Sequence, residues 1–415
     1  MTDSTRVFGM KAESGRWIFV LLGFVINICL GAVYAYSVFK GPVEKQFGAT
    51  ATQGNLPFML FLAFFAVLMF FGGKIMAKLG PAKTSLIGGV IVGAGWILSY
   101  FATNIWFLMV TYGVVAGSGV GLVYGCPIAT AAQWFPDRKG LAVGLTVAGF
   151  GGSPFVTANI ATPMIKFYQE QGSISPVFLI LGLVFLAIIL LCSIPLKAPV
   201  AGWKPAGWQP TAAQAAAAVD LDRSAIVKTG TFWGLLSCFT IGSLAGLMAI
   251  GISKPAGQEL IGIEAALSGS LVGIFAIFNG LGRPIFGTLT DKITPKYAAA
   301  INMGIIMLMS IGMLMAGQGD IALYIGCFIG FWMCLGGWLA IAPTATGTYF
   351  GMKNYAQNYG VVFFAYGIGA ILGGIISGQA KDMFGSYQVA FYPTAALGLL
   401  GVIIALLLIK PVKKA

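Results

Sequence analysis

One positively charged side chain stands inside an otherwise apolar stretch of this sequence. Arg283 lies in the run Asn279-Gly-Leu-Gly-Arg-Pro-Ile-Phe-Gly-Thr-Leu-Thr-Asp-Lys292, which belongs to a segment long enough to cross a membrane. A charge at that depth costs at least ~2.5 kcal/mol on insertion scales, so it persists beside a partner or a water-filled cavity. A guanidinium pairs with a carboxylate through two charge-assisted hydrogen bonds. We therefore interpret Arg283 as the centre of an anion-binding site.

The neighbours of Arg283 support this interpretation. Asn279 lies four residues earlier, on the same face of a helix, so its amide can point at the same spot. The sequence has 12 acidic residues, and nearly all of them fall in predicted loops or at the ends of apolar segments. Two alternatives remain, in which Arg283 extends to the membrane surface or pairs with a carboxylate of another helix.

Composition indicates an all-α, polytopic membrane protein. Of the 415 residues, 58% are hydrophobic and 9% are charged, a balance that no soluble domain tolerates on its surface. At roughly 20 residues per spanning helix, the chain has room for about twelve spans. The polar breaks divide it into an N-terminal segment (1–16), a six-helix half (17–196), a linker (197–230), a second six-helix half (231–409) and a tail (410–415).

The basic residues predict the orientation. With the N-terminus in the cytoplasm, 18 Lys and Arg residues fall on the cytoplasmic side and 5 on the opposite side. Cytoplasmic loops are enriched in Lys and Arg, so both termini are expected to be cytoplasmic. The net charge of +12 comes without a basic face of interleaved aromatic residues, and we expect no nucleic-acid partner. We interpret the first apolar segment as an uncleaved helix.

The sequence lacks the residues that several kinds of chemistry require. Histidine is absent, and the six cysteines lie in apolar runs without a Cys-x-x-Cys pair, so we expect no metal site. No Gly-x-Gly-x-x-Gly follows a predicted strand, and no Gly-x-Ser-x-Gly is present. The sequence therefore predicts neither a cofactor nor an enzyme.

The two halves contain matching landmarks. Gly73 and Gly287 each follow the second span of a half, and Phe135 and Phe350 each end a fourth span. The separations of these two pairs along the chain differ by a single position, which indicates an internal duplication. Secondary transporters are built from such repeats, with the substrate site near the midplane between them.

Local motifs resemble those of a known family. The pattern Gly-x-x-x-Asp-Lys in a twelve-span chain resembles the major facilitator superfamily, and Asp291 and Lys292 stand where that resemblance implies a gating motif. The first-half copy has Ala77 in place of the acid. More narrowly, the chain is similar to the oxalate:formate antiporter family and its monocarboxylate-transporter relatives, through the motifs Gly121-Leu-Val-Tyr-Gly, Trp134-Phe-Pro-Asp-Arg-Lys-Gly, Phe278-Asn-Gly-Leu-Gly-Arg-Pro and Asn358-Tyr-Gly.

The resemblance narrows the expected substrate. Oxalate-transporting members of that family have a lysine in span 11, and the matching position here is Tyr366. A single cation suits a single carboxylate, since a dianion leaves one charge uncompensated in a poorly hydrated site. Tyr34 and Tyr124 match aromatic positions that line the family's cavity, and Tyr366 offers a hydroxyl. For each tyrosine, a role in helix packing is the alternative.

The coupling residue is harder to place. Animal monocarboxylate carriers have an aspartate four residues before the span 8 arginine, and Asn279 stands there instead. Glu259 and Glu264, between spans 7 and 8, are the candidate proton acceptors. The alternative is that both are solvated carboxylates in a loop.

These observations predict a proton-coupled symporter of small monocarboxylates such as lactate or pyruvate, which works by alternating access. We expect a monomer in a prokaryotic plasma or inner membrane, with the bilayer, the monocarboxylate and the proton as its partners. An organic-anion exchanger of the oxalate:formate type is the alternative transporter. A non-transporting receptor or sensor is the alternative from another class.

Overall fold

The structure is a computed structural model, and it describes residues 6–135, 137, 139–200, 203–206, 221–351 and 354–412. Within these ranges, the side chains at positions 77, 132, 139–141, 291, 355 and 356 lie outside the description. The described chain is helical apart from a two-stranded antiparallel hairpin formed by β1 (Arg6–Val7) and β2 (Met10–Lys11).

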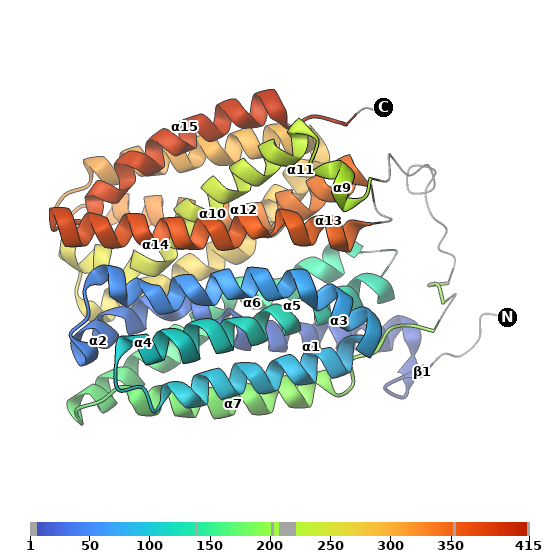
Figure 1. Ribbon diagram of the computed structural model, residues 1–415, viewed down its shortest axis with the longest axis horizontal. Coiled ribbons are helices and arrows are strands. Elements are labelled where there is room, and N and C mark those ends of the chain that lie inside the picture. Colours follow the sequence, from blue (N-terminus) through green and yellow to red (C-terminus); the bar gives the residue numbers. More distant parts are fainter. Residues whose placement is uncertain are drawn as a thin grey trace.

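The first half of the chain forms one bundle of long helices, drawn in blue to green in Figure 1. Its first span is long, because α1 and α2 continue each other through a short 3-10 turn. The elements are α1 (Ala12–Leu30), η1 (Gly31–Ala35), α2 (Tyr36–Phe47), α3 (Ala51–Ser99), α4 (Ile105–Leu108), η2 (Met109–Ala116), α5 (Gly117–Trp134), α6 (Lys139–Glu170) and α7 (Ser175–Ser193).

The second half forms a similar bundle, drawn in yellow-green to red in Figure 1. A short helix at the end of the linker precedes it. The elements are α9 (Arg223–Ile226), α10 (Gly230–Ala256), η3 (Gly257–Ile261), α11 (Ala265–Met315), α12 (Ile321–Phe350), α13 (Tyr355–Val362), α14 (Phe364–Phe384), η4 (Tyr387–Ala390) and α15 (Phe391–Leu408).

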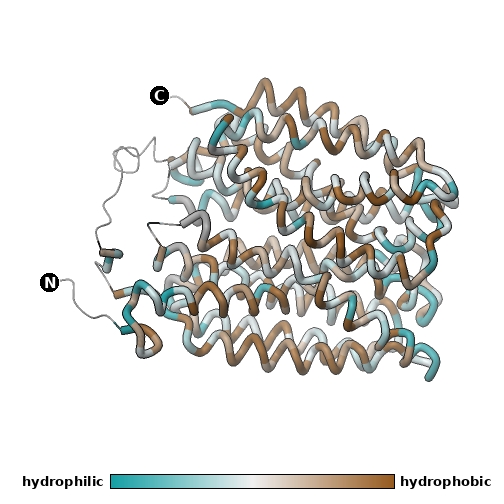
Figure 2. Tube along the Cα trace, turned by 180° about the vertical axis from the view of Figure 1, so that it is seen from behind, coloured by the Kyte–Doolittle hydropathy of each residue, from teal (hydrophilic) through white to brown (hydrophobic). Residues whose placement is uncertain are grey.

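The described helices match the expected number of membrane spans. Eleven are long and apolar enough to cross a bilayer. The predicted fifth span corresponds to α6, which has 32 residues but contains many glycines and hydroxyl side chains, so its mean hydropathy is lower. Apolar residues cover much of the length of the bundle, and hydrophilic residues gather at its two ends (Figure 2). The all-α prediction is confirmed.

The duplication is visible in the backbone. The second and third spans of each half are joined without a loop, by a sharp bend inside α3 and inside α11. The bends fall at Gly80 (φ 79°, ψ 167°) and Thr294 (φ 77°, ψ 154°), and each is followed by a proline. Gly80 and Thr294 have the same separation along the chain as the predicted landmarks Gly73 and Gly287.

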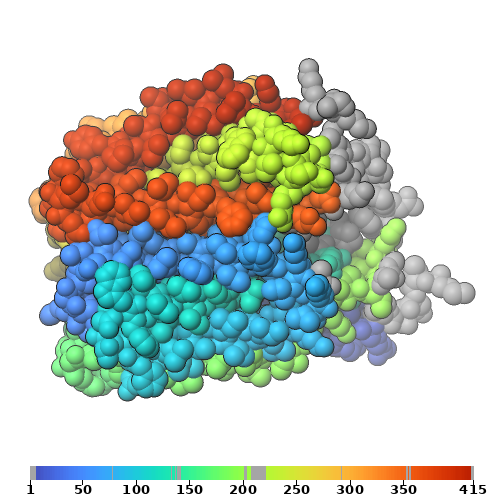
Figure 3. All heavy atoms as spheres, viewed as in Figure 1, coloured from blue at the N-terminus to red at the C-terminus, as the bar shows by residue number. Residues whose placement is uncertain are grey.

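The two halves pack against each other mainly along two helix pairs, α3 with α14 and α6 with α11. Figure 3 shows the blue and the orange helices in contact along the length of one face. Small residues allow these pairs to approach closely. A Cβ added at Gly151 of α6 lies 2.8 Å from the Asn279 side chain of α11, and one at Gly378 of α14 lies 2.7 Å from Thr52 of α3.

Both chain ends belong to the same end of the bundle, since α1 begins and α15 ends there (Figure 1). We call this the terminal end, and the opposite one the distal end. The linker joins the halves at the terminal end, although residues 201–202 and 207–220 of it lie outside the described ranges.

Candidate functional site

Arg283 lies on α11 at the interface between the halves. Its side chain is buried, with 3% of the residue exposed. Nη1 donates a hydrogen bond of 2.7 Å to the backbone carbonyl of Val147 on α6. This contact holds the guanidinium across the interface rather than at the membrane surface, and no described carboxylate forms an ion pair with it.

The other two nitrogens of Arg283 are left without a hydrogen bond of standard geometry. Nε and Nη2 are both buried, and neither donates a hydrogen bond to a described group. In a guanidinium, these two nitrogens form one edge, whose parallel N–H groups match the two oxygens of a carboxylate. A buried unpaired donor costs about 1–3 kcal/mol, more when charged. The free edge of Arg283 is therefore suited to a carboxylate ligand.

Three tyrosines from three other helical elements surround this arginine. The hydroxyls of Tyr34, Tyr124 and Tyr366 all lie close enough to Arg283 to interact electrostatically with its charge. The Tyr124 hydroxyl lies within hydrogen-bonding reach of the guanidinium, while Nε and Nη2 keep no partner of standard geometry. The Tyr34 and Tyr366 hydroxyls lie 2.5 Å apart and share a hydrogen bond, which uses one of their two hydrogens and leaves the other available as a donor. The structure thus brings together Arg283 and all three predicted tyrosines.

Aromatic side chains that the sequence did not single out pack around the tyrosines. Phe150 lies 5.0 Å from Tyr34, Phe65 lies 5.1 Å from Tyr124 and Phe363 lies 5.0 Å from Tyr366, measured between ring centroids. Trp332 of α12 lies 6.4 Å from Tyr34. No local signal marks these residues, since each sits in a run of similar apolar residues. Together they place the Arg283 charge in an environment of low dielectric constant.

Asn279 lies beside the site and faces a different helix. Its Nδ2 donates a 2.9 Å hydrogen bond to the Trp332 carbonyl, whereas its Oδ1 is buried without a partner. The backbone of Asn279 also touches α12, since a Cβ added at Gly336 would overlap the Asn279 carbonyl oxygen. The Nδ2 and the backbone of Asn279 thus hold α11 against α12.

The structure does not bring the two candidate proton acceptors to Arg283. Glu264 directly precedes α11 and is exposed, and the part of α11 that separates it from Arg283 corresponds to roughly 28 Å of helix. Glu259 is exposed in η3 and forms a 2.5 Å ion pair with Lys381. Of the two residues of the predicted gating motif, Lys292 is exposed, and the Asp291 side chain lies outside the described residues.

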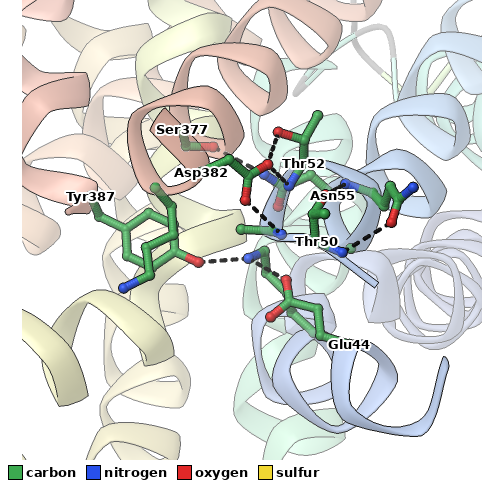
Figure 4. A network of polar contacts seen from close by, with 12 residues as sticks. Glu44, Thr50, Thr52, Asn55, Ser377, Asp382 and Tyr387 are labelled. Atoms are coloured by element: carbon green, nitrogen blue, oxygen red, sulfur yellow. Dashed lines mark hydrogen bonds and ion pairs between the residues drawn. The ribbon is translucent and has the colours of Figure 1, made fainter. Parts of the chain in front are cut away.

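At the distal end, a buried lysine connects the two halves. Lys40 of α2 is fully buried, and its Nζ pairs with Glu44 Oε1 at 2.6 Å. The same nitrogen donates a 2.7 Å hydrogen bond to the Tyr387 hydroxyl, which belongs to the second half (Figure 4). Because a buried charge needs such partners, separation of the halves at this point would leave Lys40 only Glu44.

A second set of distal contacts joins α14 to the start of α3 (Figure 4). Asp382 accepts hydrogen bonds from the backbone N–H of Ala51 (3.0 Å) and Thr52 (2.9 Å), and from the Thr52 hydroxyl. A carboxylate is favoured at this helix N-terminus because the unpaired N–H groups carry partial positive charge. Asn55 adds hydrogen bonds to the Gly374 carbonyl and the Ser377 hydroxyl. We call these contacts and the Lys40–Tyr387 contact the distal latch.

At the terminal end, the last residues of the linker cross between the halves. Leu221 donates to the Phe350 carbonyl and accepts from Asn358 Nδ2 at 3.0 Å. Two residues later, the Arg223 guanidinium lies 4.2 Å from the centroid of the Phe70 ring on α3. Asn358 opens one of the motifs noted in the sequence, and its contact with the linker gives that motif a structural role.

A second terminal motif anchors the start of the chain. Arg16 forms a bidentate ion pair with Asp137, at 2.6 and 2.8 Å, and also donates to the Trp134 carbonyl. The Trp134 indole in turn donates to the Lys197 carbonyl at 2.7 Å. The Trp134-Phe-Pro-Asp motif thus fastens the first helix and the beginning of the linker to α5.

A bundle of long apolar helices with a duplicated half, and with a buried arginine that forms no described ion pair between the halves, defines a membrane transporter. The model of the Major Facilitator Superfamily matches residues 20–349, and the chain belongs to this family. It is a multi-pass membrane protein, as predicted.

Among characterised relatives, the oxalate:formate antiporter of Oxalobacter formigenes is 29% identical over 408 residues, which cover 96% of this chain and 94% of that protein. An uncharacterised transporter of the same superfamily from Escherichia coli K12, YhjX, is 25% identical over 86% of both chains. Monocarboxylate transporter 9 of Rattus norvegicus is 31% identical over 161 residues, which are 38% of this chain and 31% of that protein. These findings confirm the predicted family group.

Solved structures show the same fold. A bacterial homologue of the human lysosomal transporter Spinster, in an inward-facing and unoccupied conformation, superposes with a TM-score of 0.71 at 14% sequence identity. The match covers 94% of this chain and 96% of that one. At this identity, the similarity establishes the fold alone.

Proposed function

We propose that this transporter carries small monocarboxylates of the lactate and pyruvate type by alternating access, with Arg283 as the residue that binds the carboxylate. The unpaired Nε–Nη2 edge of Arg283 supports this proposal more than any other observation. A carboxylate that enters the site accepts two hydrogen bonds from that edge and removes the cost of leaving the guanidinium unpaired.

The surroundings of Arg283 favour a monoanion. Tyr34, Tyr124 and Tyr366 supply hydroxyls and no charge, and the three described ion pairs of the protein all lie elsewhere. Phe65, Phe150 and Trp332 offer apolar walls for a short alkyl group. A second carboxylate would meet no cation there, so a dianion would enter the site with one charge uncompensated.

We further propose that transport is coupled to protons. Glu259 and Glu264 remain the candidates from the sequence, and the geometry adds Glu44, which is 22% exposed and pairs with the buried Lys40 between the halves. The distribution of lysines and arginines supports placing the terminal end in the cytoplasm and the distal end outside. In that orientation, all three carboxylates face the external proton supply.

The test is uptake of radiolabelled lactate into proteoliposomes, with and without an inward proton gradient. Arg283→Ala is expected to lower the initial rate at low lactate on the order of 100-fold, because two charge-assisted hydrogen bonds are lost. Arg283→Lys retains the charge without the bidentate edge, so its uptake rate should lie between those of wild type and Arg283→Ala. Uptake by Arg283→Ala equal to wild type would show that the carboxylate binds elsewhere.

The same vesicles test coupling. Accumulation above the external concentration should require the proton gradient and should disappear in the variant that removes the coupling carboxylate. Glu259→Gln, Glu264→Gln and Glu44→Gln are compared one by one. A variant that still accumulates lactate under the gradient eliminates that carboxylate as the acceptor.

Exchange of organic anions is the second candidate function. The full-length similarity to an oxalate:formate antiporter favours it. An exchanger would take up label only into vesicles preloaded with an unlabelled anion and would ignore the pH gradient. Uptake into empty vesicles that follows the proton gradient would instead support symport.

A further inference from the structure

A small pocket opens at the distal end between the two halves. It has a volume of about 260 Å³ and lies between α2 and α6 of the first half and α10 and η3 of the second. Its polar lining consists of Lys45 and Gln169 from the first half, Lys254 and Gln258 from the second, and Ser37. None of the described residues that line it is a carboxylate. The pocket is smaller than the ~300–1,000 Å³ typical of sites for drug-sized ligands, so its occupant must be small.

The charges in this pocket lack partners. Two of the five distal lysines, Lys40 and Lys381, are paired with Glu44 and Glu259. Within the described chain, Lys45 and Lys254 take part in none of the three ion pairs. Lys254 is half-buried in the interface, where water screens its charge less than at the surface. Two unpaired cations from opposite halves therefore share one pocket.

Ser37 provides an independent indication of a ligand. Its side chain lines the pocket, yet it is fully buried and its Oγ forms no hydrogen bond to any described group. Buried hydroxyls are normally paired, since an unpaired one costs about 1–3 kcal/mol. An acceptor that enters the pocket would supply the missing partner. The lining thus offers two cations, two amides and one free hydroxyl.

We propose that this pocket is a second anion site, which binds a small oxyanion between Lys45 and Lys254 with Ser37 as a donor. It does not depend on Arg283. A carboxylate in solution and the phosphate of an anionic lipid headgroup share the required chemistry. Because α2 also carries Lys40, an anion that bridges Lys45 and Lys254 holds the halves together beside the distal latch. Binding therefore favours conformations in which the distal end is closed.

A neighbouring pocket serves as the comparison. It has a volume of about 210 Å³ and lies between α6 and α11, and Lys166 is the single charged residue among the described ones that line it. If lysines at the distal end only extended to the membrane surface, Lys45, Lys166 and Lys254 would behave alike. The proposal instead requires Lys45 and Lys254 to act on a bound anion and Lys166 to have no effect.

The experiment is calorimetric titration of the full chain with sodium lactate, in nanodiscs of neutral phosphatidylcholine, with lactamide as the uncharged control. In the Arg283→Ala background, one lactate-binding event should remain. Adding Lys45→Gln or Lys254→Gln should weaken it at least about tenfold, as expected for a lost charge-assisted hydrogen bond. Lys166→Gln should leave it unchanged, and lactamide should not bind.

The outcomes separate the two sites. Absence of lactate binding in Arg283→Ala, or residual binding that Lys45→Gln and Lys254→Gln leave intact, would overturn the second site and leave the central one standing. Binding that survives Arg283→Ala at full strength and disappears in Lys254→Gln would support the second site and contradict the central one. Repeating the titration in nanodiscs that contain phosphatidylglycerol identifies the occupant. If the site binds a lipid headgroup, the anionic lipid should displace lactate; if it binds a soluble anion, lactate binding should be unchanged.

Discussion

Under the proposed function, the residue at position 366 determines the charge of the central site. The Tyr366 hydroxyl lies 2.5 Å from that of Tyr34, and both are within the influence of the Arg283 charge. A hydroxyl at this place can donate to one oxygen of a bound carboxylate without adding charge. We therefore propose that the choice between one and two carboxylates in the substrate depends on a side chain that is already part of the hydrogen-bonded cluster.

Tyr366→Lys is therefore expected to admit a dianion. The lysine adds a second cation beside Arg283, and in the absence of substrate the two like charges repel each other and destabilise the protein. Oxalate should relieve that repulsion and bind at least about tenfold more tightly to the variant than to wild type. Thermal unfolding of the purified variant with oxalate and with lactate measures the effect.

Tyr366→Phe is the control for this substitution. It removes the hydroxyl without adding charge, so it should weaken lactate binding and should not strengthen oxalate binding. If Tyr366→Lys and Tyr366→Phe respond alike to oxalate, position 366 does not set the charge preference of the site.

At the scale of helices, the bends in α3 and α11 show how far local sequence determines the fold. A proline follows each bend, and the residue before a proline is disfavoured in the α conformation. Gly80 adopts the required positive φ freely, whereas Thr294 adopts it at a cost. The two bends redirect the chain without a loop, and they do so at equivalent positions of the two halves.

Gly80→Ala should destabilise the protein by about 1–3 kcal/mol. The backbone there (φ 79°) is one that residues with a Cβ avoid, and a Cβ added at Gly80 meets no atom within 4 Å, so the penalty comes from the backbone alone. Gly73→Ala is the matched control, because Gly73 lies inside the same helix with equal space around it. Alanine is favoured in a helix by ~1 kcal/mol, so Gly73→Ala should raise the midpoint of thermal unfolding. Equal effects of the two changes would contradict a strained bend.

The helices, their duplication and the cluster of Arg283 with the three tyrosines could be predicted, because local hydropathy, repeated landmarks and family motifs carry that information. The contacts of individual side chains could not. Asn279 shares a helix face with Arg283, yet its amide donates to Trp332, 53 residues away in sequence. Likewise Glu259 pairs with Lys381, 122 residues away. Such partners are set by the packing of distant helices, which no local pattern encodes.

Across the whole molecule, the two ends are closed by different means. At the terminal end, Leu221 and Arg223 of the linker contact both halves through Asn358 and Phe70. At the distal end, the latch consists of direct contacts between helices of the two halves. Alternating access requires these two sets of contacts to form and break in turn, so weakening one set should shift the population toward the conformation open at that end.

Asp382→Asn should therefore favour opening of the distal end. The substitution removes the negative charge that accepts hydrogen bonds from Ala51 and Thr52 at the start of α3, a loss of about 1–3 kcal/mol in the closed conformation alone. A change of about 1.4 kcal/mol alters the ratio of closed to open molecules roughly tenfold. Spin labels on cysteines at Thr103 and Ala322, both exposed, report the distance between the halves at this end when Cys192, the half-buried native cysteine, is replaced by serine.

Asp320→Asn is the matched control for this experiment, because Asp320 precedes α12 and its carboxylate accepts from Gly317 within the same half. We expect Asp382→Asn to add a population at longer distance and Asp320→Asn to reproduce the wild-type distribution. If both variants kept the wild-type distances, the contacts of Asp382 would contribute nothing to closure, and the latch would consist of the Asn55 contacts and of Lys40, Glu44 and Tyr387. Lys40→Met or Asn55→Ala would then have to produce the open population, since they remove the remaining hydrogen bonds to Tyr387 and to α14.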